Sequence, residues 1–126
     1  MQRREVAATV AWWVTQRVGL THPCLERALT ELQSGAPISP HIASAVQQLV
    51  SELDSKYFEL QEQAEAGRIS RAEVSGAFGL ARAANSVLSA LSEDAAEAAY
   101  EAIAATDALA EVRKIVLSAL THGVQT

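Results

Sequence analysis

The side chains with the clearest chemical potential in this chain are its single cysteine, Cys24, and its three histidines, His22, His41 and His122. His22 and Cys24 lie near the start of an expected helix, where backbone amides lower the pKa of a thiol, so a nucleophilic Cys/His pair is one interpretation. We favour the other, in which Cys24 packs in the core, because free cysteines are among the most buried residues. No other pattern completes a catalytic site, so we predict that the chain is not an enzyme.

Metal and cofactor sites need spacings that this sequence lacks. No two histidines are spaced as ligands on one helix face, and no Glu-x-x-His pair of a di-iron bundle occurs. A glycine-rich phosphate loop and a G-x-S-x-G nucleophile elbow are also missing. We therefore expect no metal and no cofactor. The lone cysteine has no intrachain disulfide partner, which favours a reducing compartment.

The composition predicts that these residues are carried by helices. The chain has 126 residues, enough for one domain but not two, and it contains 25 alanines, 6 glycines and 3 prolines. Alanine favours helices and disfavours strands. We expect an all-α bundle in which residues 1–126 form one helical domain and most neighbouring helices are antiparallel.

Start and stop signals divide the chain into five or six helices. Short oxygen-bearing side chains at N-caps, proline in a first turn and glycine after a last turn mark the boundaries. They predict helices at residues 3–18, 23–34, 40–66 and 71–91, and two more that begin near residues 92–94 and 106–107 and end near Gly123. No apolar window approaches the roughly 20 residues that a bilayer crossing needs, so we expect a soluble, cytoplasmic protein with no membrane partner.

The helix predicted at residues 71–91 is apolar on two sides, which places it in the middle of the bundle. We expect Phe78 to lie in the core. Asn85 is expected either to be buried and hydrogen-bonded or to contact a ligand. A third side would let a neighbouring helix approach closely, because it carries mainly small residues: Ser75, Gly79, Arg82, Ser86 and Ser89.

Part of the same helix, the segment EVSGAFGLAR from Glu73 to Arg82, resembles the first helix and glycine turn of helix-turn-helix DNA-binding proteins. The resemblance covers residues 70–91 and implies a recognition helix at residues 81–91, with Asn85 at a normally aliphatic position. That helix offers one arginine, and the net charge of -5 opposes binding to phosphate. We expect no nucleic-acid partner and keep a DNA-binding regulator as an alternative function.

Acidic residues are distributed unevenly along the chain. The helix predicted at residues 40–66 holds five carboxylates against one lysine, Lys56: Glu52, Asp54, Glu59, Glu62 and Glu65. A second block comprises Glu93, Asp94, Glu97 and Glu101, of which three share one face at four-residue spacing, where like charges repel. This second block is either a solvated face or a docking surface whose charge steers a basic protein.

Two pairs of adjacent aromatic residues, Trp12–Trp13 and Tyr57–Phe58, provide a second indication of an interface. Adjacent side chains on a helix point about 100 degrees apart, so one narrow apolar stripe cannot hold both members of a pair. Trp13 and Tyr57 fit the inner stripes, which leaves Trp12 and Phe58 at the edges. These two rings are either covered by other helices or exposed as interface anchors.

Together these observations favour a small, acidic, non-catalytic module that binds and regulates one specific basic protein. The predicted partner-binding residues are Glu93, Asp94, Glu97, Glu101, Trp12 and Phe58. Immunity proteins and antitoxins, which block a toxin, are the sub-class that we prefer by analogy. A helix-turn-helix regulator and a small Cys/His enzyme are the alternatives, and formation of a homo-oligomer stays open.

Overall fold

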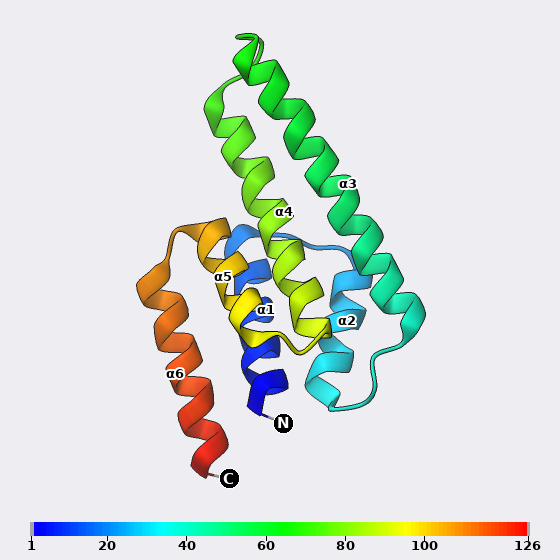
Figure 1. Cartoon of the computed structure of the whole chain (residues 1–126), viewed down its shortest axis with the longest axis vertical. Helices are drawn as coiled ribbons and strands as arrows, with labels where there is room; N and C mark the ends of the chain where they lie inside the picture. The colour runs from blue at the N-terminus through cyan, green and yellow to red at the C-terminus, as the bar shows by residue number, and fades with distance from the viewer. Residues whose placement is uncertain (1, 126) are drawn as a thin grey trace.

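Residues 2–125 form six α-helices that pack against one another, as the computed structural model shows (Figure 1). The structure describes the backbone of residues 2–125 and the side-chain surroundings of residues 3–121. The helices are α1 Gln2–Val18, α2 Pro23–Ser34, α3 Pro40–Glu65, α4 Arg71–Leu91, α5 Ala95–Thr106 and α6 Leu109–Gln125. The predicted all-α bundle is confirmed, and the described backbone contains no strand.

Most helix boundaries follow the predicted signals. The Ser70 hydroxyl accepts a hydrogen bond from the Glu73 amide at 3.4 Å, which caps the start of α4. α2 ends where Gly35 takes a φ of 77°, a left-handed conformation that glycine adopts without steric cost. The end of α6 differs from the prediction, because this helix continues to Gln125 rather than ending near Gly123.

The end of α2 is fixed to two neighbouring helices by charged side chains. The Glu31 carboxylate accepts hydrogen bonds from the Ser39 amide at 2.7 Å and from the Ser39 hydroxyl at 3.0 Å, where α3 begins. From α1, Arg4 donates to the carbonyl oxygens of Glu31 at 2.8 Å and of Leu32 at 3.2 Å, and to that of Ala36. Backbone groups that lack a partner inside their own helix are thereby satisfied.

α4 lies in the middle of the bundle and packs against α1, α2, α3 and α5. Most of its second half is buried, and the buried residues are mainly small: Gly79, Ala81, Ala83, Ala84, Ser86, Val87 and Ala90. The predicted central position is therefore confirmed. Because alanine buries little apolar area, the hydrophobic free energy of the core comes mainly from larger side chains on the surrounding helices, such as Val10, Leu25 and Val46.

α5 approaches α4 closely along the side that the sequence marks with small residues. A Cβ atom on Gly79 would lie 3.2 Å from the carbonyl oxygen of Ala105, and the Ser86 hydroxyl donates a hydrogen bond to the carbonyl oxygen of Ala98 at 2.8 Å. The predicted close approach of a neighbouring helix is thus confirmed.

The second half of α3 and the first half of α4 project beyond the other helices as a hairpin (Figure 1), and we call residues 54–78 the arm. The buried residues of α3 end at Val50, and those of α4 begin at Gly79. Phe78 is only partly buried, so the prediction that it lies in the core is wrong. The reason is that α1, α2, α5 and α6 do not cover this part of the hairpin.

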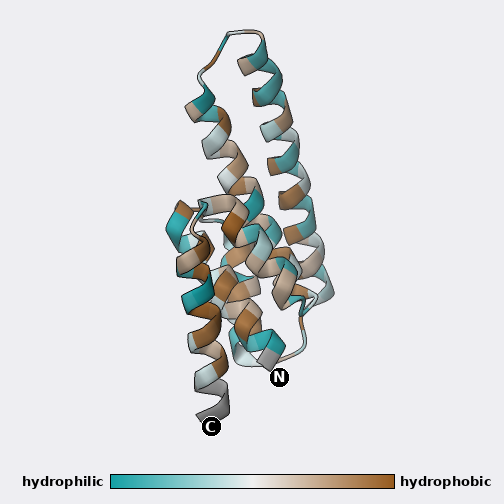
Figure 2. Cartoon of the chain, turned by 60° about the vertical axis from the view of Figure 1, so that its left-hand side comes forward, coloured by the Kyte–Doolittle hydropathy of each residue, from teal (hydrophilic) through white to brown (hydrophobic). Residues whose placement is uncertain are grey.

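The distribution of hydropathy matches this arrangement. Figure 2 shows hydrophobic positions gathered where the helices pack together and along α6, whereas hydrophilic positions alternate with them on the projecting arm. No helix within residues 2–125 combines the length and the hydropathy needed to cross a membrane.

Candidate functional site

Arg82 links three helices at the base of the arm. Its Nη2 donates to Oδ1 of Asp54 on α3 at 2.9 Å, and its Nη1 donates to Oε2 of Glu101 on α5 at 3.0 Å. Its guanidinium carbon lies 5.8 Å from the centre of the Phe78 ring, within the range of a cation–π contact. Arginine suits this position because its planar group presents several donors in fixed directions.

Glu101 was predicted to bind a partner at the surface, but its side chain is buried. The residue is 5% exposed and forms its ion pair with Arg82. Burial raises the pKa of Glu101 above its ordinary value and Glu97 raises it further, although the charge of Arg82 opposes the rise. The regular acidic spacing was misleading because the residue that neutralises Glu101 lies on another helix.

The other acidic residues of this block remain at the surface but do not form the expected stripe. Glu93 precedes α5 in a turn with a φ of 57°, and the Asp94 carboxylate caps the helix by accepting a hydrogen bond from the Glu97 amide at 3.0 Å. Arg3 of α1 lines the same shallow hollow as Glu93 and Asp94. The acidic block is therefore close to Arg3, a cation that is distant from it in sequence.

The two predicted aromatic anchors are both exposed. Trp12 on α1 is 47% exposed, and Phe58 on the arm is 60% exposed. Since α1 and α3 do not pack against each other within the described residues, the structure does not join the two rings into one cluster.

Phe58 lies at the edge of a cluster of three aromatic rings centred on Tyr57, and sequence reasoning did not find this cluster. The ring centres of Tyr57 and Phe58 are 5.2 Å apart, and so are those of Tyr57 and Phe78. Asp54 and Phe58 are four residues apart on α3, as are Phe78 and Arg82 on α4, so both spacings could have indicated a shared face.

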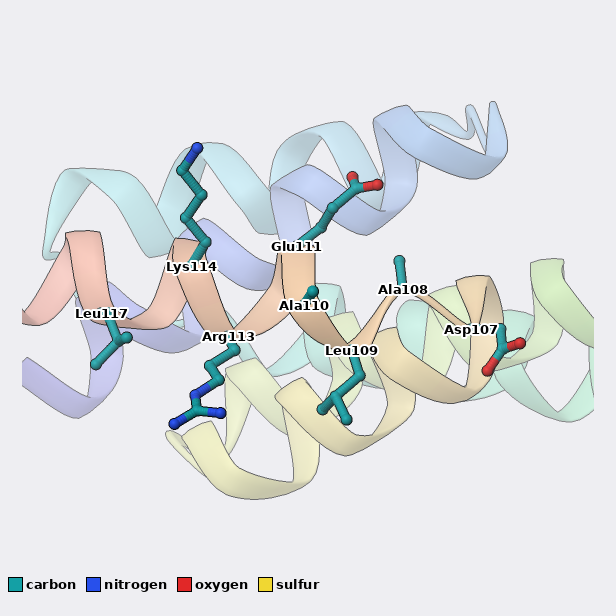
Figure 3. Close-up of a pocket in the computed structure, with 8 residues that line it drawn as sticks. All are labelled: Asp107, Ala108, Leu109, Ala110, Glu111, Arg113, Lys114 and Leu117. Atoms are coloured by element: carbon teal, nitrogen blue, oxygen red, sulfur yellow. The ribbon is translucent and has the colours of Figure 1, made fainter.

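Sequence reasoning also missed an apolar surface on α5 and α6. Tyr100 is 64% exposed, Leu109 62% and Leu117 56%. Leu109 and Leu117 line a shallow hollow of about 630 Å³, and Figure 3 shows Leu109 and Arg113 pointing toward the ribbon of α5, while Lys114 and Glu111 point away. Exposed apolar area of this kind is typical of an interaction surface.

Cys24 and His22 have structural roles in the described fold. Cys24 is buried in the core cluster with Leu25 and Ala28, and burial raises the pKa of its thiol, which disfavours the nucleophilic thiolate. The Nδ1 of His22 accepts a hydrogen bond from the Cys24 amide at 3.2 Å and so caps α2. His41 is exposed near the start of α3, and the side chain of His122 lies outside the described residues.

The helix-turn-helix resemblance does not correspond to the structure. Arg71–Leu91 is one continuous helix, so Gly76 and Gly79 lie inside it and form no turn. The implied recognition helix is packed in the bundle and cannot enter a DNA groove. Asn85 is partly buried, and its Nδ2 donates to the carbonyl oxygen of Ala81 at 2.9 Å, so it is bonded within its own helix.

No group of three or more His, Cys, Asp or Glu side chains within the described residues is arranged to hold a metal ion.

Comparison of the chain with protein-family models, with curated proteins and with solved structures finds no match. By its fold and surface, the protein is an all-α bundle with a projecting arm, exposed aromatic rings and exposed acidic residues.

Proposed function

We propose that this chain is a non-catalytic protein-binding module that recognises one basic protein and regulates or inhibits it. The observation that carries the proposal is the exposure of two large aromatic side chains, with Phe58 60% and Trp12 47% exposed. Aromatic anchors contribute a large share of the binding free energy in protein interfaces. Phe58 is the stronger candidate, because it belongs to a cluster of three rings rather than standing alone.

The charge of the molecule supports a basic partner. The chain carries 15 acidic and 10 basic residues, and the acidic side chains at the start of α5 and on α3 include exposed Glu93, Glu97, Glu59 and Glu62. Such a surface raises the association rate of a positively charged protein and orients it. In the sub-class that we favour, the partner is a toxin with a basic active site, which the bound module covers as immunity proteins and antitoxins do.

The experiment begins with capture of a partner from cell extract on the immobilised protein and its purification. Surface-plasmon kinetics at two ionic strengths then compare the parent with Phe58→Ala, Trp12→Ala and Glu97→Gln, with Glu26→Gln, an exposed change on α2, as the matched control. We expect at least one aromatic variant to raise the dissociation rate about tenfold or more, and Glu97→Gln to slow association most at low salt.

The inhibitory role has its own measurement in the same system. If the captured partner is an enzyme or toxin, one equivalent of the parent protein should abolish its activity, and the weaker-binding aromatic variant should require a higher concentration. A captured protein whose kinetics are unchanged by every variant would contradict the proposed binding surface. Failure of the parent to hold any protein at micromolar concentration would contradict the function itself.

A further inference from the structure

Arg82 is the residue through which the base of the arm is joined to α5. Its guanidinium donates to Asp54 on α3 at 2.9 Å and to the two carboxylate oxygens of Glu101 on α5 at 3.0 and 3.3 Å. α3 and α5 themselves do not contact each other within the described residues. The base of the arm and α5 are therefore coupled through one guanidinium group and the helix that carries it.

This link lies at the boundary between the packed helices and the arm. No residue from 54 to 78 is fully buried, whereas Gly79 and Ala81 are. The guanidinium carbon of Arg82 also lies 5.8 Å from the centre of the Phe78 ring, which lies 5.2 Å from that of Tyr57. A displacement of the guanidinium therefore changes the surroundings of α3 and of the aromatic rings together.

The charges around this guanidinium do not balance. Three carboxylates, those of Asp54, Glu97 and Glu101, lie around one cation. Glu97, one turn before Glu101 on α5, interacts with it by charge and by a side-chain hydrogen bond. Two neighbouring carboxyl groups form such a bond only when one of them carries a proton, so this arrangement favours proton uptake.

The other helices packed against α5 do not neutralise this site. The charged side chains that the structure describes on α1 and α6 form no ion pair with Glu101: Arg3, Arg4, Glu5, Arg17, Glu111, Arg113 and Lys114. Arg17 and Glu111 pair with each other at 3.6 Å, and Arg4 is bound to carbonyl oxygens at the end of α2. The other charged residues of α4, Arg71 and Glu73, lie in the arm at least nine residues before Arg82.

Burial and the neighbouring Glu97 raise the pKa of Glu101, although the charge of Arg82 opposes the rise. Glu101 therefore takes up a proton at a higher pH than an exposed glutamate does. A neutral carboxyl group accepts a hydrogen bond from a guanidinium roughly half as strongly as a carboxylate. Protonation of Glu101 weakens the bond of Arg82 to α5 and leaves its bond to Asp54 on α3.

We propose that Glu101 is a proton-sensitive switch for the base of the arm. When Glu101 is charged, Arg82 is shared between α5 and α3, and when Glu101 takes up a proton, the guanidinium moves toward Asp54 and away from α5. The aromatic cluster of the arm responds to this movement through the contact of Arg82 with Phe78. The switch is a property of the fold and does not depend on the proposed function.

The test follows both sides of the switch in one NMR titration of the full chain, from neutral pH downward. The carboxyl carbon of Glu101 reports its protonation. The Nε–H of Arg82, which is buried and has no acceptor within the described residues, reports the position of the guanidinium. We expect the signals of this group, of the Phe78 ring and of the Asp54 amide to shift with the midpoint of the Glu101 carboxyl group, above the ordinary glutamate pKa.

Substitutions separate this response from other titrations. Glu101→Gln fixes a neutral side chain, so this step should disappear, and the Phe78 ring should give the low-pH shifts of the parent already at neutral pH. Glu97→Gln should lower the midpoint, because it removes a charge that favours the proton. Asp54→Asn should keep the titration of Glu101 but reduce the response of the α3 amides. Glu111→Gln, a change in the surface ion pair with Arg17, is the control that should leave the step unchanged.

Three results would overturn the inference. Glu101 could take up its proton at or below the ordinary glutamate pKa, it could do so above this value without any shift of the Arg82 and Phe78 signals, or the step at Phe78 could persist in Glu101→Gln. The first two results come from the parent protein alone, so the test remains decisive even if a variant fails to fold.

Discussion

Arg82 and Glu101 form the most buried ion pair in the described part of the chain, with side chains 25% and 7% exposed. Removing one partner from such a pair leaves the other charge buried without compensation. The free-energy cost of that buried charge is larger than the stabilisation that the intact pair provides. We expect Arg82→Met to lower the free energy of unfolding by about 3 kcal/mol, and the double variant Arg82→Met with Glu101→Leu to recover part of this loss. Urea unfolding measures both values.

A surface ion pair provides the control for this prediction. Arg17 and Glu111 lie 3.6 Å apart with side chains about half exposed, so Arg17→Met should cost less than about 1 kcal/mol. Equal losses from Arg17→Met and Arg82→Met would show that burial adds nothing to the role of Arg82.

The raised pKa of Glu101 predicts a specific dependence of stability on pH. Because burial makes the folded protein hold this proton more tightly than the unfolded chain, Glu101 favours folding below the ordinary glutamate pKa, and this contribution is lost as the pH rises through the raised value. The unfolding free energy of the parent minus that of Glu101→Gln should therefore decrease as the pH rises above the ordinary glutamate pKa.

Glu31 should behave in the opposite way and is the matched control. Its hydrogen bond from the Ser39 amide lowers the pKa of the carboxyl group, so Glu31 favours folding above the ordinary glutamate pKa and loses that contribution as the pH falls through the lowered value. The difference between the parent and Glu31→Gln should increase with pH in the acidic range. The same direction for both variants would refute the assignment of causes.

At the scale of single helices, two glycines of α4 differ only in what surrounds them. Nothing lies within 4 Å of a Cβ added to Gly76, whereas one added to Gly79 would meet the carbonyl oxygen of Ala105 at 3.2 Å. We expect Gly76→Ala to raise the free energy of unfolding by about 0.5 to 1 kcal/mol through helix propensity. Gly79→Ala should fall below Gly76→Ala by about 1 kcal/mol or more, because α5 must move. Thermal unfolding of both variants decides the matter.

The helices themselves were largely predictable, because their signals are local. A proline in the first turn of α2 and α3, Ser70 before α4 and Gly35 after α2 act within a few residues of the boundary that they mark. The small residues on one side of α4 also predicted the neighbour that packs there. Periodicity could not show that α1, α2, α5 and α6 leave the first half of α4 uncovered. Phe78 fits an apolar stripe whether or not one of these helices covers it.

The site was less predictable, because its contacts join helices that are distant in sequence. Trp12 and Phe58 were identified as outward members of aromatic pairs, and both are exposed. Glu101 was misplaced, since the acidic pattern of α5 gives no sign of Arg82, which lies 19 residues earlier. The aromatic cluster likewise depends on how α3 and α4 are aligned, and this alignment is set by packing between helices rather than by either helix alone.

At the scale of the whole molecule, the arm and the packed helices should differ in local stability. Residues 60–75 contain no buried side chain, whereas Ala81, Ala84, Val87 and Ala90 are fully buried. Local opening requires less free energy where few apolar contacts are lost. We expect amide hydrogens of residues 60–75 to exchange faster than those of residues 81–90 by about two orders of magnitude or more. Equal protection in both segments, measured by mass spectrometry, would mean that the arm is covered in solution.

The turn that closes the arm offers a practical consequence for engineering. Ala66, Gly67 and Arg68 are exposed, and Gly67 has open space around it. Exposed turns with few contacts tolerate inserted sequence, so a fluorescent protein placed between Gly67 and Arg68 should leave the melting temperature of the bundle nearly unchanged. The same fusion would stand at the end of the surface that we assign to the partner, and its fluorescence polarisation would report docking in living cells without a label on the partner.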